Sequence, residues 1–198
     1  MTQTLAKLAK APRRDREDWV RAARRALIEG GVAKVKVEPL AGVLGVTTGS
    51  FYHHFRNRQD LLDAVLVHWE RENTEPLFQA VRDAGPDPDA QLDALFEAWL
   101  TESDYDPAYD SAVRDWARTS KPAEAAVRRT DDRRIDLLKQ IFLGFGYDED
   151  RAFIRARVTY FHQVGYYAME IIEDRAVRRR WRPLYREVLL GDPSRARD

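Results

Sequence analysis

The chain of 198 residues contains no cysteine. This absence excludes disulfide bonds, thiolate nucleophiles and cysteine-ligated zinc, and it suits a reducing compartment. No stretch approaches the roughly 18 consecutive apolar residues of a transmembrane helix. The N-terminal stretch also lacks the apolar segment and the cleavage pattern of a signal peptide. We therefore expect a cytoplasmic protein with no membrane partner.

Histidine is scarce as well: the chain has four, scattered except for the neighbours His53 and His54. Neighbouring side chains on a helix point about 100° apart, so this pair cannot bind one metal ion from a single face. Gly45 and Gly49 lack the lysine and the preceding strand of a phosphate-binding loop, and Ser50 lacks the sharp turn that surrounds a nucleophilic serine. We expect no catalytic residue, no metal site and no cofactor, which argues against an enzyme.

The net charge is zero, but the charges are unevenly distributed. Residues 1–62 carry twelve Lys/Arg and six Asp/Glu, whereas the other 136 residues carry 21 and 27. Five basic residues cluster near the start: Lys7, Lys10, Arg13, Arg14 and Arg16. Basic arms often bind nucleic acid, because each phosphate contact releases counterions. A solvated tail would have the same composition. We expect residues 1–14 to form a flexible basic arm.

Apolar residues recur at steps of three and four through nearly the whole chain, which is typical of amphipathic helices. Breakers such as Gly30-Gly31 and Gly85-Pro86 separate the helical segments. Residues 32–37 alternate briefly like a strand, but no partner strand is found elsewhere, so we interpret them as a linker. The pattern predicts an all-α fold of about nine helices.

The segment VTTGSFYHHF, residues 46–55, fits the second half of a helix-turn-helix. Gly45 follows Ala41 by four residues and precedes Phe51 by six. These positions call for a small residue where two helices cross, a turn residue that tolerates positive φ, and an apolar anchor. With Thr47 as N-cap, the first exposed turns of the following helix would enter a DNA major groove.

The stretch from about Asp18 to Leu62 resembles the TetR family of bacterial transcriptional regulators. The specific part of the motif is a Gly-Val, polar residues, a small residue, Tyr-x-His-Phe, and a basic residue before Leu-Leu. In this chain those places are taken by Gly45-Val46, Ser50, Tyr52-His53-His54-Phe55, Arg58 and Leu61-Leu62. Arg58 stands where lysine is more usual and keeps the charge.

The resemblance implies a DNA-binding surface on this motif, with Tyr52, His54 and Arg58 toward the DNA backbone and His53 at a variable site. Each residue would equally suit an ordinary cap or surface position. The DNA-binding candidates are Thr47, Thr48, Gly49, Ser50, Tyr52, His53, His54 and Arg58.

The resemblance also implies two domains: a three-helix DNA-binding domain at 15–62 and an effector-binding and dimerisation domain at 63–198. The second is rich in large aromatic residues, which line ligand pockets but equally fill cores. Candidate pocket residues are Trp99, Trp116, His162, Gln163 and Tyr166. Buried polar groups need partners, which favours His162 and Gln163 over the others.

The last two helices carry apolar stripes, and in the TetR family these helices pair two subunits as a four-helix bundle. The candidate dimer residues are Phe153, Arg157, Tyr160, Phe161, Val164, Ala168, Leu184 and Val188. The alternative is that one stripe packs only within its own subunit. We interpret the run from Arg178 to Arg182 as a solvated helix face or an ion-paired rim.

The spacing thus predicts a DNA-binding element, and the resemblance implies a homodimeric, sequence-specific transcriptional regulator of double-stranded palindromic DNA. The resemblance adds a repressor released by an unidentified small apolar or amphipathic effector. The alternative is an architectural or protein-regulated DNA-binding protein with no small-molecule effector, whose C-terminal core would be packed without a cavity.

Overall fold

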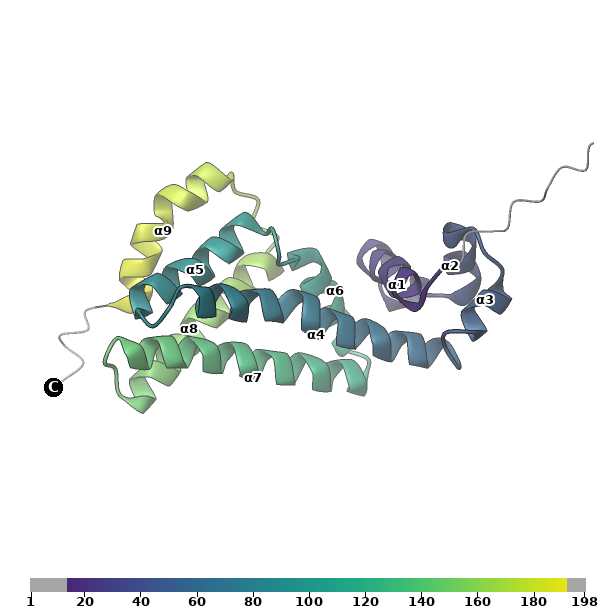
Figure 1. Cartoon of the computed structure of the whole chain (residues 1–198). Coiled ribbons are helices and arrows are strands. Elements are labelled where there is room, and N and C mark those ends of the chain that lie inside the picture. The colour runs from purple at the N-terminus through teal and green to yellow at the C-terminus, as the bar shows by residue number, and fades with distance from the viewer. Residues whose placement is uncertain (1–13, 192–198) are drawn as a thin grey trace, which may run out of the picture. The chain divides into compact units, whose positions relative to one another are not determined.

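The computed structural model describes residues 14–191, and the predicted basic arm lies outside them apart from Arg14. The described chain forms nine α-helices and one short 3₁₀ turn, which confirms the predicted all-α fold class (Figure 1). The elements are α1 (Arg16–Gly30), η1 (Val32–Lys34), α2 (Val37–Leu44), α3 (Thr48–Tyr52), α4 (Arg58–Asp83), α5 (Pro88–Thr101), α6 (Pro107–Ala117), α7 (Lys121–Gly144), α8 (Glu149–Ala168) and α9 (Arg175–Leu190).

The chain divides into two compact units, one up to Val65 and one from Leu66 onward. The first holds α1, η1, α2, α3 and the start of α4, and the second holds the rest of α4 and the remaining helices. Residues 32–37, expected to be a linker, form the η1 turn and the approach to α2. The alternating residues 32–37 therefore form neither a strand nor an irregular linker, because they contain a 3₁₀ turn and the first residue of α2.

Side-chain caps fix where most helices begin. An aspartate or serine immediately before α1, α5, α6, α7, α8 and α9 accepts a hydrogen bond from a backbone N–H of the first turn. At α1 the contact is reciprocal, because Asp15 and Asp18 each accept from the other's backbone N–H. Such caps satisfy donors that have no partner inside the helix.

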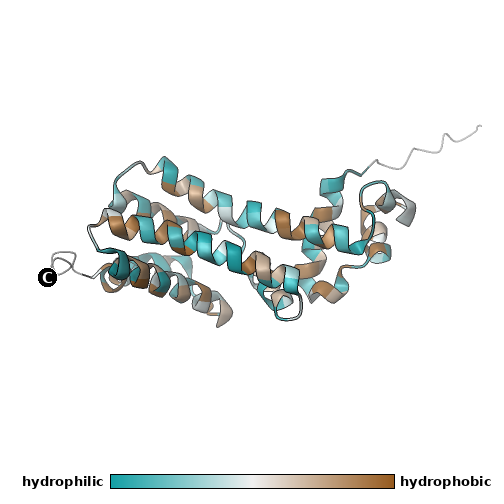
Figure 2. Cartoon of the chain, turned by 90° about the horizontal axis from the view of Figure 1, so that it is seen from below, coloured by the Kyte–Doolittle hydropathy of each residue, from teal (hydrophilic) through white to brown (hydrophobic). Residues whose placement is uncertain are grey.

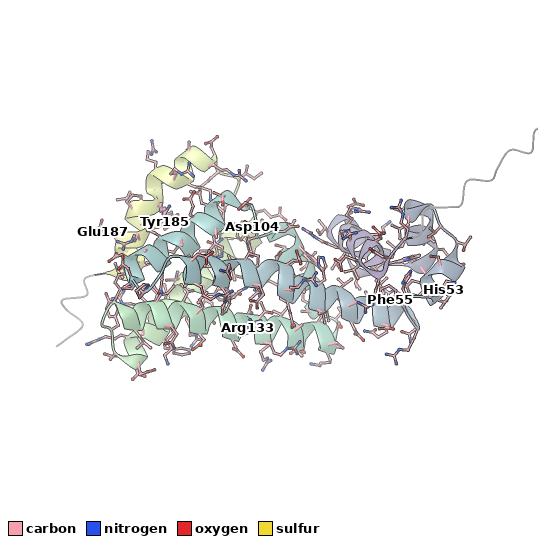
Figure 3. All side chains as sticks on the ribbon, viewed as in Figure 1. His53, Phe55, Asp104, Arg133, Tyr185 and Glu187 are labelled. Carbon is pink, nitrogen blue, oxygen red and sulfur yellow. The ribbon has the colours of Figure 1, made fainter. Side chains whose placement is uncertain are left out.

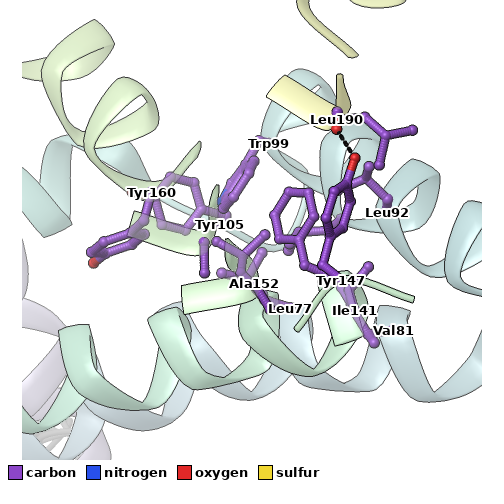
Figure 4. Packing of buried hydrophobic residues seen from close by; sticks show 14 residues of the cluster. Leu77, Val81, Leu92, Trp99, Tyr105, Ile141, Tyr147, Ala152, Tyr160 and Leu190 are labelled. Carbon is purple, nitrogen blue, oxygen red and sulfur yellow. Dashed lines mark hydrogen bonds between the residues drawn. The ribbon is translucent and has the colours of Figure 1, made fainter. Parts of the chain in front are cut away.

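Figure 2 colours the chain by hydropathy and shows apolar and polar residues interleaved along each helix. Within residues 14–191 no helix is both long and apolar enough to cross a membrane. The apolar residues instead build the core of the second unit (Figure 4). The Tyr147 hydroxyl donates to the Leu190 carbonyl there and fixes the end of α9 to this core.

A buried polar cluster joins α6, α7 and α8 inside the second unit. Asp110 accepts from Arg114 at 2.8 Å and from Arg134 at 2.9 Å, and Arg114 also bonds to Asp131 at 2.6 Å. The Tyr160 hydroxyl donates to Asp131 at 2.6 Å. Burial would raise the pKa of Asp110, but the Arg134 and Arg114 charges outweigh burial and lower it. This carboxylate is therefore charged and fully paired inside the protein.

Candidate nucleic-acid interface and cavity

The helix-turn-helix of the first unit is assembled around Phe51, which is completely buried. Its ring meets Trp19 of α1 edge-on at 5.2 Å between centroids and stacks on Phe55 at 5.3 Å. The guanidinium of Arg16 lies 4.7 Å from the centre of the Phe55 ring. Figure 3 labels Phe55 and His53, which are close in sequence but differ in burial: Phe55 belongs to the core and His53 is exposed.

Gly45 makes the turn between α2 and α3. Its φ of 69° places it in the left-handed region that favours glycine. The Val46 N–H then donates to the Ala41 carbonyl at 3.0 Å and closes the turn. Thr47 occupies the N-cap position of α3 with an extended backbone, as predicted, although its side chain makes no capping hydrogen bond.

Most of the predicted groove-facing residues lie on one exposed surface at α3. Thr47, Thr48, Gly49, Tyr52 and His53 are exposed, and Ser50 is half-buried. The Tyr52 side chain is 65% exposed although its ring touches that of Phe51. The surface therefore offers hydroxyl, imidazole and phenol groups together.

Two residues predicted to contact the DNA backbone, His54 and Arg58, have hydrogen-bond partners within the first unit. The His54 ring Nε2 lies 2.9 Å from the Arg14 carbonyl oxygen and holds the start of α1. Arg58 donates from Nε to the Val35 carbonyl and from Nη2 to the Val32 carbonyl, each at 2.6 Å. Both side chains satisfy carbonyls around the helix-turn-helix, so their first role is to brace it.

The second unit contains a cavity of about 80 Å³ bordered by α5, α8, α9 and the segment between the last two. Four of the five predicted pocket residues line it: Trp99, His162, Gln163 and Tyr166. Trp116 does not, because it is buried on α6 instead. The lining residues absent from the sequence prediction are Phe96, Leu100, Thr159, Glu173, Arg178, Arg182, Tyr185 and Leu189.

Polar atoms in the cavity wall lack partners. The Thr159 hydroxyl and the Gln163 Nε2 are buried with no hydrogen-bond partner among residues 14–191. The His162 ring lies tilted by 52° against the ring of Tyr185 on α9, at 4.7 Å between centroids, and burial lowers the pKa of the His162 imidazole. The spacing of Thr159, Gln163 and Tyr166 along one helix face was the signal available in the sequence.

Salt bridges connect α9 to α5 beside the cavity. Arg178 pairs with Glu102 at 2.9 Å, and Arg179 and Arg182 pair with Glu97 at 2.8 Å and 2.7 Å. The basic run that we interpreted as a solvated face or a rim is therefore largely an ion-paired rim.

The predicted dimer residues divide between surface and interior. Phe153, Arg157, Phe161, Ala168, Leu184 and Val188 are exposed, whereas Val164 is half-buried against the core. Tyr160 is buried in its own subunit, because its hydroxyl bonds to Asp131 and Arg114, so the prediction of an intersubunit role for it is wrong. Ile154 and Val158, absent from the prediction, extend the exposed apolar stripe of α8.

Comparison with known proteins finds a family likeness in the first unit. Residues 20–65 match the model of bacterial regulatory proteins of the tetR family. The chain therefore resembles the TetR family in its first unit. The chain is also 30% identical over 125 residues to the HTH-type transcriptional regulator BetI of Stenotrophomonas maltophilia. That match covers 61% of the chain and 62% of BetI, under two thirds of the relative's own length.

Solved structures share the fold across most of the chain. A transcriptional regulator from Rhodococcus sp. Rha1 has a TM-score of 0.65 at 21% identity, covering 89% of this chain and 92% of that one. NemR from E. coli in its reduced form has a TM-score of 0.67 at 18% identity, covering 89% and 94%. At these identities the likeness concerns the fold alone.

Proposed function

We propose that this chain is a TetR-family, sequence-specific DNA-binding transcriptional regulator whose α3 enters the major groove. The observation that carries the proposal is the exposed polar surface of Thr47, Thr48, Ser50, Tyr52 and His53 on a helix-turn-helix braced from behind by Phe51. Hydroxyl and imidazole groups can contact base edges or phosphates. His54 and Arg58 then act by holding this surface in place.

Gly49 supports the same assignment. A methyl group added at Gly49 would meet only the Thr47 hydroxyl, at an ordinary 3.6 Å, and the Gly49 φ is not in the left-handed region. Nothing within the first unit therefore requires glycine at this position. A close approach of the backbone to DNA does supply a reason for it.

The decisive experiment is selection of bound fragments from random double-stranded DNA, followed by titration of the selected site with variants. Thr48→Ala and Tyr52→Ala should each weaken binding about tenfold, since one good contact is worth about 1–3 kcal/mol. Val67→Ala, which changes an exposed residue of α4 outside this surface, should bind like the wild type. Unchanged affinity in both α3 variants, with helicity intact, would contradict the assignment.

We further propose a homodimer formed through the exposed apolar residues of α8 and α9, which would present two α3 helices to a palindromic site. Contiguous exposed apolar surface of this kind marks an interaction site. Leu184 and Val188 on α9 lie mostly exposed, as do Ile154, Val158 and Phe161 on α8.

The cavity favours regulation by a small molecule over an architectural role, for which a solidly packed second unit was expected. As a repressor, the protein would release DNA when a ligand binds preferentially to the conformation with lower operator affinity. Titrating the selected DNA site in the presence of a metabolite extract, fractionated by size, tests this role.

A further inference from the structure

We propose that the cavity between α5, α8 and α9 binds an uncharged compound with a single aromatic ring, held through an amide or carbonyl group. This inference rests on the proposed effector role of the cavity and names the chemical class of its ligand. Four properties of the cavity lead to it: its volume, its aromatic walls, its unpaired polar atoms and its compensated charges.

The volume of the cavity matches a ligand with one ring. The cavity offers about 80 Å³, and one ordered water takes roughly 10–15 Å³ on such a scale. The space therefore holds about as many heavy atoms as a benzene ring with a short polar substituent. A fused polycyclic ligand would exceed this volume and extend beyond the aromatic walls.

The walls suit a flat ring. Phe96 and Trp99 of α5 stack on one another at 6.0 Å between ring centroids. His162 and Tyr185 form a second ring pair from α8 and α9. Offset stacking and edge-to-face contacts between aromatic rings add to the free energy of simple burial. An aromatic ligand can make such contacts with these lining rings, which an aliphatic one of equal size cannot.

The polar group of the ligand follows from Gln163 and Thr159. Their side chains lie one turn apart on α8, both line the cavity, and each has a buried polar atom with no partner in the part of the chain that the structure describes. Leaving such groups unpaired costs free energy. A carbonyl oxygen can accept from the Gln163 amide after rotation of that side chain, and an amide N–H can donate to the Thr159 hydroxyl.

The charges around the cavity oppose an ionic ligand. The Arg178 guanidinium is paired with Glu102, and that of Arg182 is paired with Glu97 and, at 3.2 Å, with Asp93. Glu173 accepts from the Tyr166 hydroxyl at 3.2 Å. An anion would meet the Glu173 carboxylate, and the arginines that could attract it are already paired. A cation would have to lie beside the guanidinium groups of Arg178 and Arg182.

The test is calorimetric titration of the full chain at pH 7 with four matched probes: benzamide, benzoate, benzylammonium and 2-naphthamide. We expect benzamide to bind at least tenfold more tightly than each of the other three. Equal or tighter binding of either ion overturns the uncharged class, and equal or tighter binding of 2-naphthamide overturns the single ring. No detectable benzamide binding overturns the proposal as a whole.

The variant Gln163→Leu separates the polar contact from packing. It should weaken benzamide binding about five- to tenfold, the value of one hydrogen bond, and leave ethylbenzene binding unchanged. The Tm should not fall, because the variant removes a buried amide that is not fully paired. The control Gln140→Leu changes an exposed glutamine of α7 outside the cavity. It should alter neither the binding of benzamide nor the binding of ethylbenzene. Unchanged benzamide affinity in Gln163→Leu overturns the contact.

A parallel DNA titration distinguishes this inference from the proposed function. Benzamide that binds through Gln163 without changing DNA affinity would support the ligand class and contradict the effector role. Intact DNA binding with no benzamide binding would overturn the ligand class alone. Loss of site-specific DNA binding in every condition would contradict the proposed regulator, whatever benzamide does.

Discussion

At the scale of residues, the motif around α3 separates into side chains that face outward and side chains that brace it. The sequence pattern correctly predicted Phe51 as a buried anchor and Thr47 at the N-cap position. It did not reveal the internal partners of His54 and Arg58, because those partners are backbone carbonyls. A carbonyl is present at every position, so it leaves no trace in the sequence.

The Arg58 contacts lead to a prediction about stability. Arg58→Ala removes two hydrogen bonds to the η1 region and should lower the free energy of unfolding by about 1 kcal/mol, a value reduced because the side chain is partly exposed. Urea unfolding followed by circular dichroism measures this. Arg56→Ala, which shortens a side chain that is 88% exposed, is the control. An equal loss of unfolding free energy in Arg58→Ala and Arg56→Ala would argue against a bracing role for Arg58.

At the scale of elements, caps and breakers made helix starts predictable, whereas some helix ends were not. Pro76 lies inside α4, which continues to Asp83. Proline removes a helical hydrogen bond, yet Leu77 and Val81 beyond it are buried in the core of the second unit. Tertiary burial of these residues outweighed the local signal.

The buried cluster joining α6, α7 and α8 should be the most sensitive polar site of the second unit. Asp110→Asn leaves Arg134 buried without a counter-charge and should lower the free energy of unfolding by about 3 kcal/mol. Chemical denaturation at neutral pH measures the loss. Asp115→Asn is the matched control on the same helix, since its pair with Arg118 is exposed. A small loss in Asp110→Asn, like that of the control, would contradict the importance of the pairing.

The same carboxylate predicts a pH dependence. An unfolded aspartate titrates near about 3.9, and the pKa of Asp110 is lower in the folded protein. Its contribution is therefore present above about pH 4 and is lost as the pH falls through the folded pKa. The difference in unfolding free energy between the wild type and Asp110→Asn should narrow below about pH 4. A difference that stays constant from neutral pH to about pH 2 would disprove this linkage.

At the scale of the whole molecule, the exposed apolar residues of α8 and α9 predict the oligomeric state. Val188→Glu places a charge at a side chain that is 78% exposed in the single chain, and it should shift the protein to monomers because burying the charge between subunits is costly. Sedimentation velocity measures the shift. Val67→Glu changes a similarly exposed valine of α4 and should leave the wild-type assembly intact. Dimers in both variants would place the interface elsewhere.

The cavity shows how far sequence reasoning reaches at this scale. Helical periodicity predicted which aromatic residues face inward, so Trp99 and Tyr166 were found. Helical periodicity does not show which helix packs against which. Trp116 was therefore predicted to line the pocket, although it lies on α6 outside the cavity. The α9 wall was missed entirely, because its contribution depends on salt bridges to α5 between residues about 80 positions apart.

Those salt bridges have a consequence for how tightly the cavity holds any ligand. Arg179, Arg182 and Arg186 tie the wall of α9 to acidic residues of α5 through contacts that remain open to solvent. Dissolved salt weakens the interaction between exposed charges. The distance over which this screening acts is roughly 10 Å at 0.1 M salt, and it becomes shorter as the salt concentration rises. Binding of an uncharged ligand should therefore weaken as ionic strength rises, even though the ligand itself carries no charge to be screened.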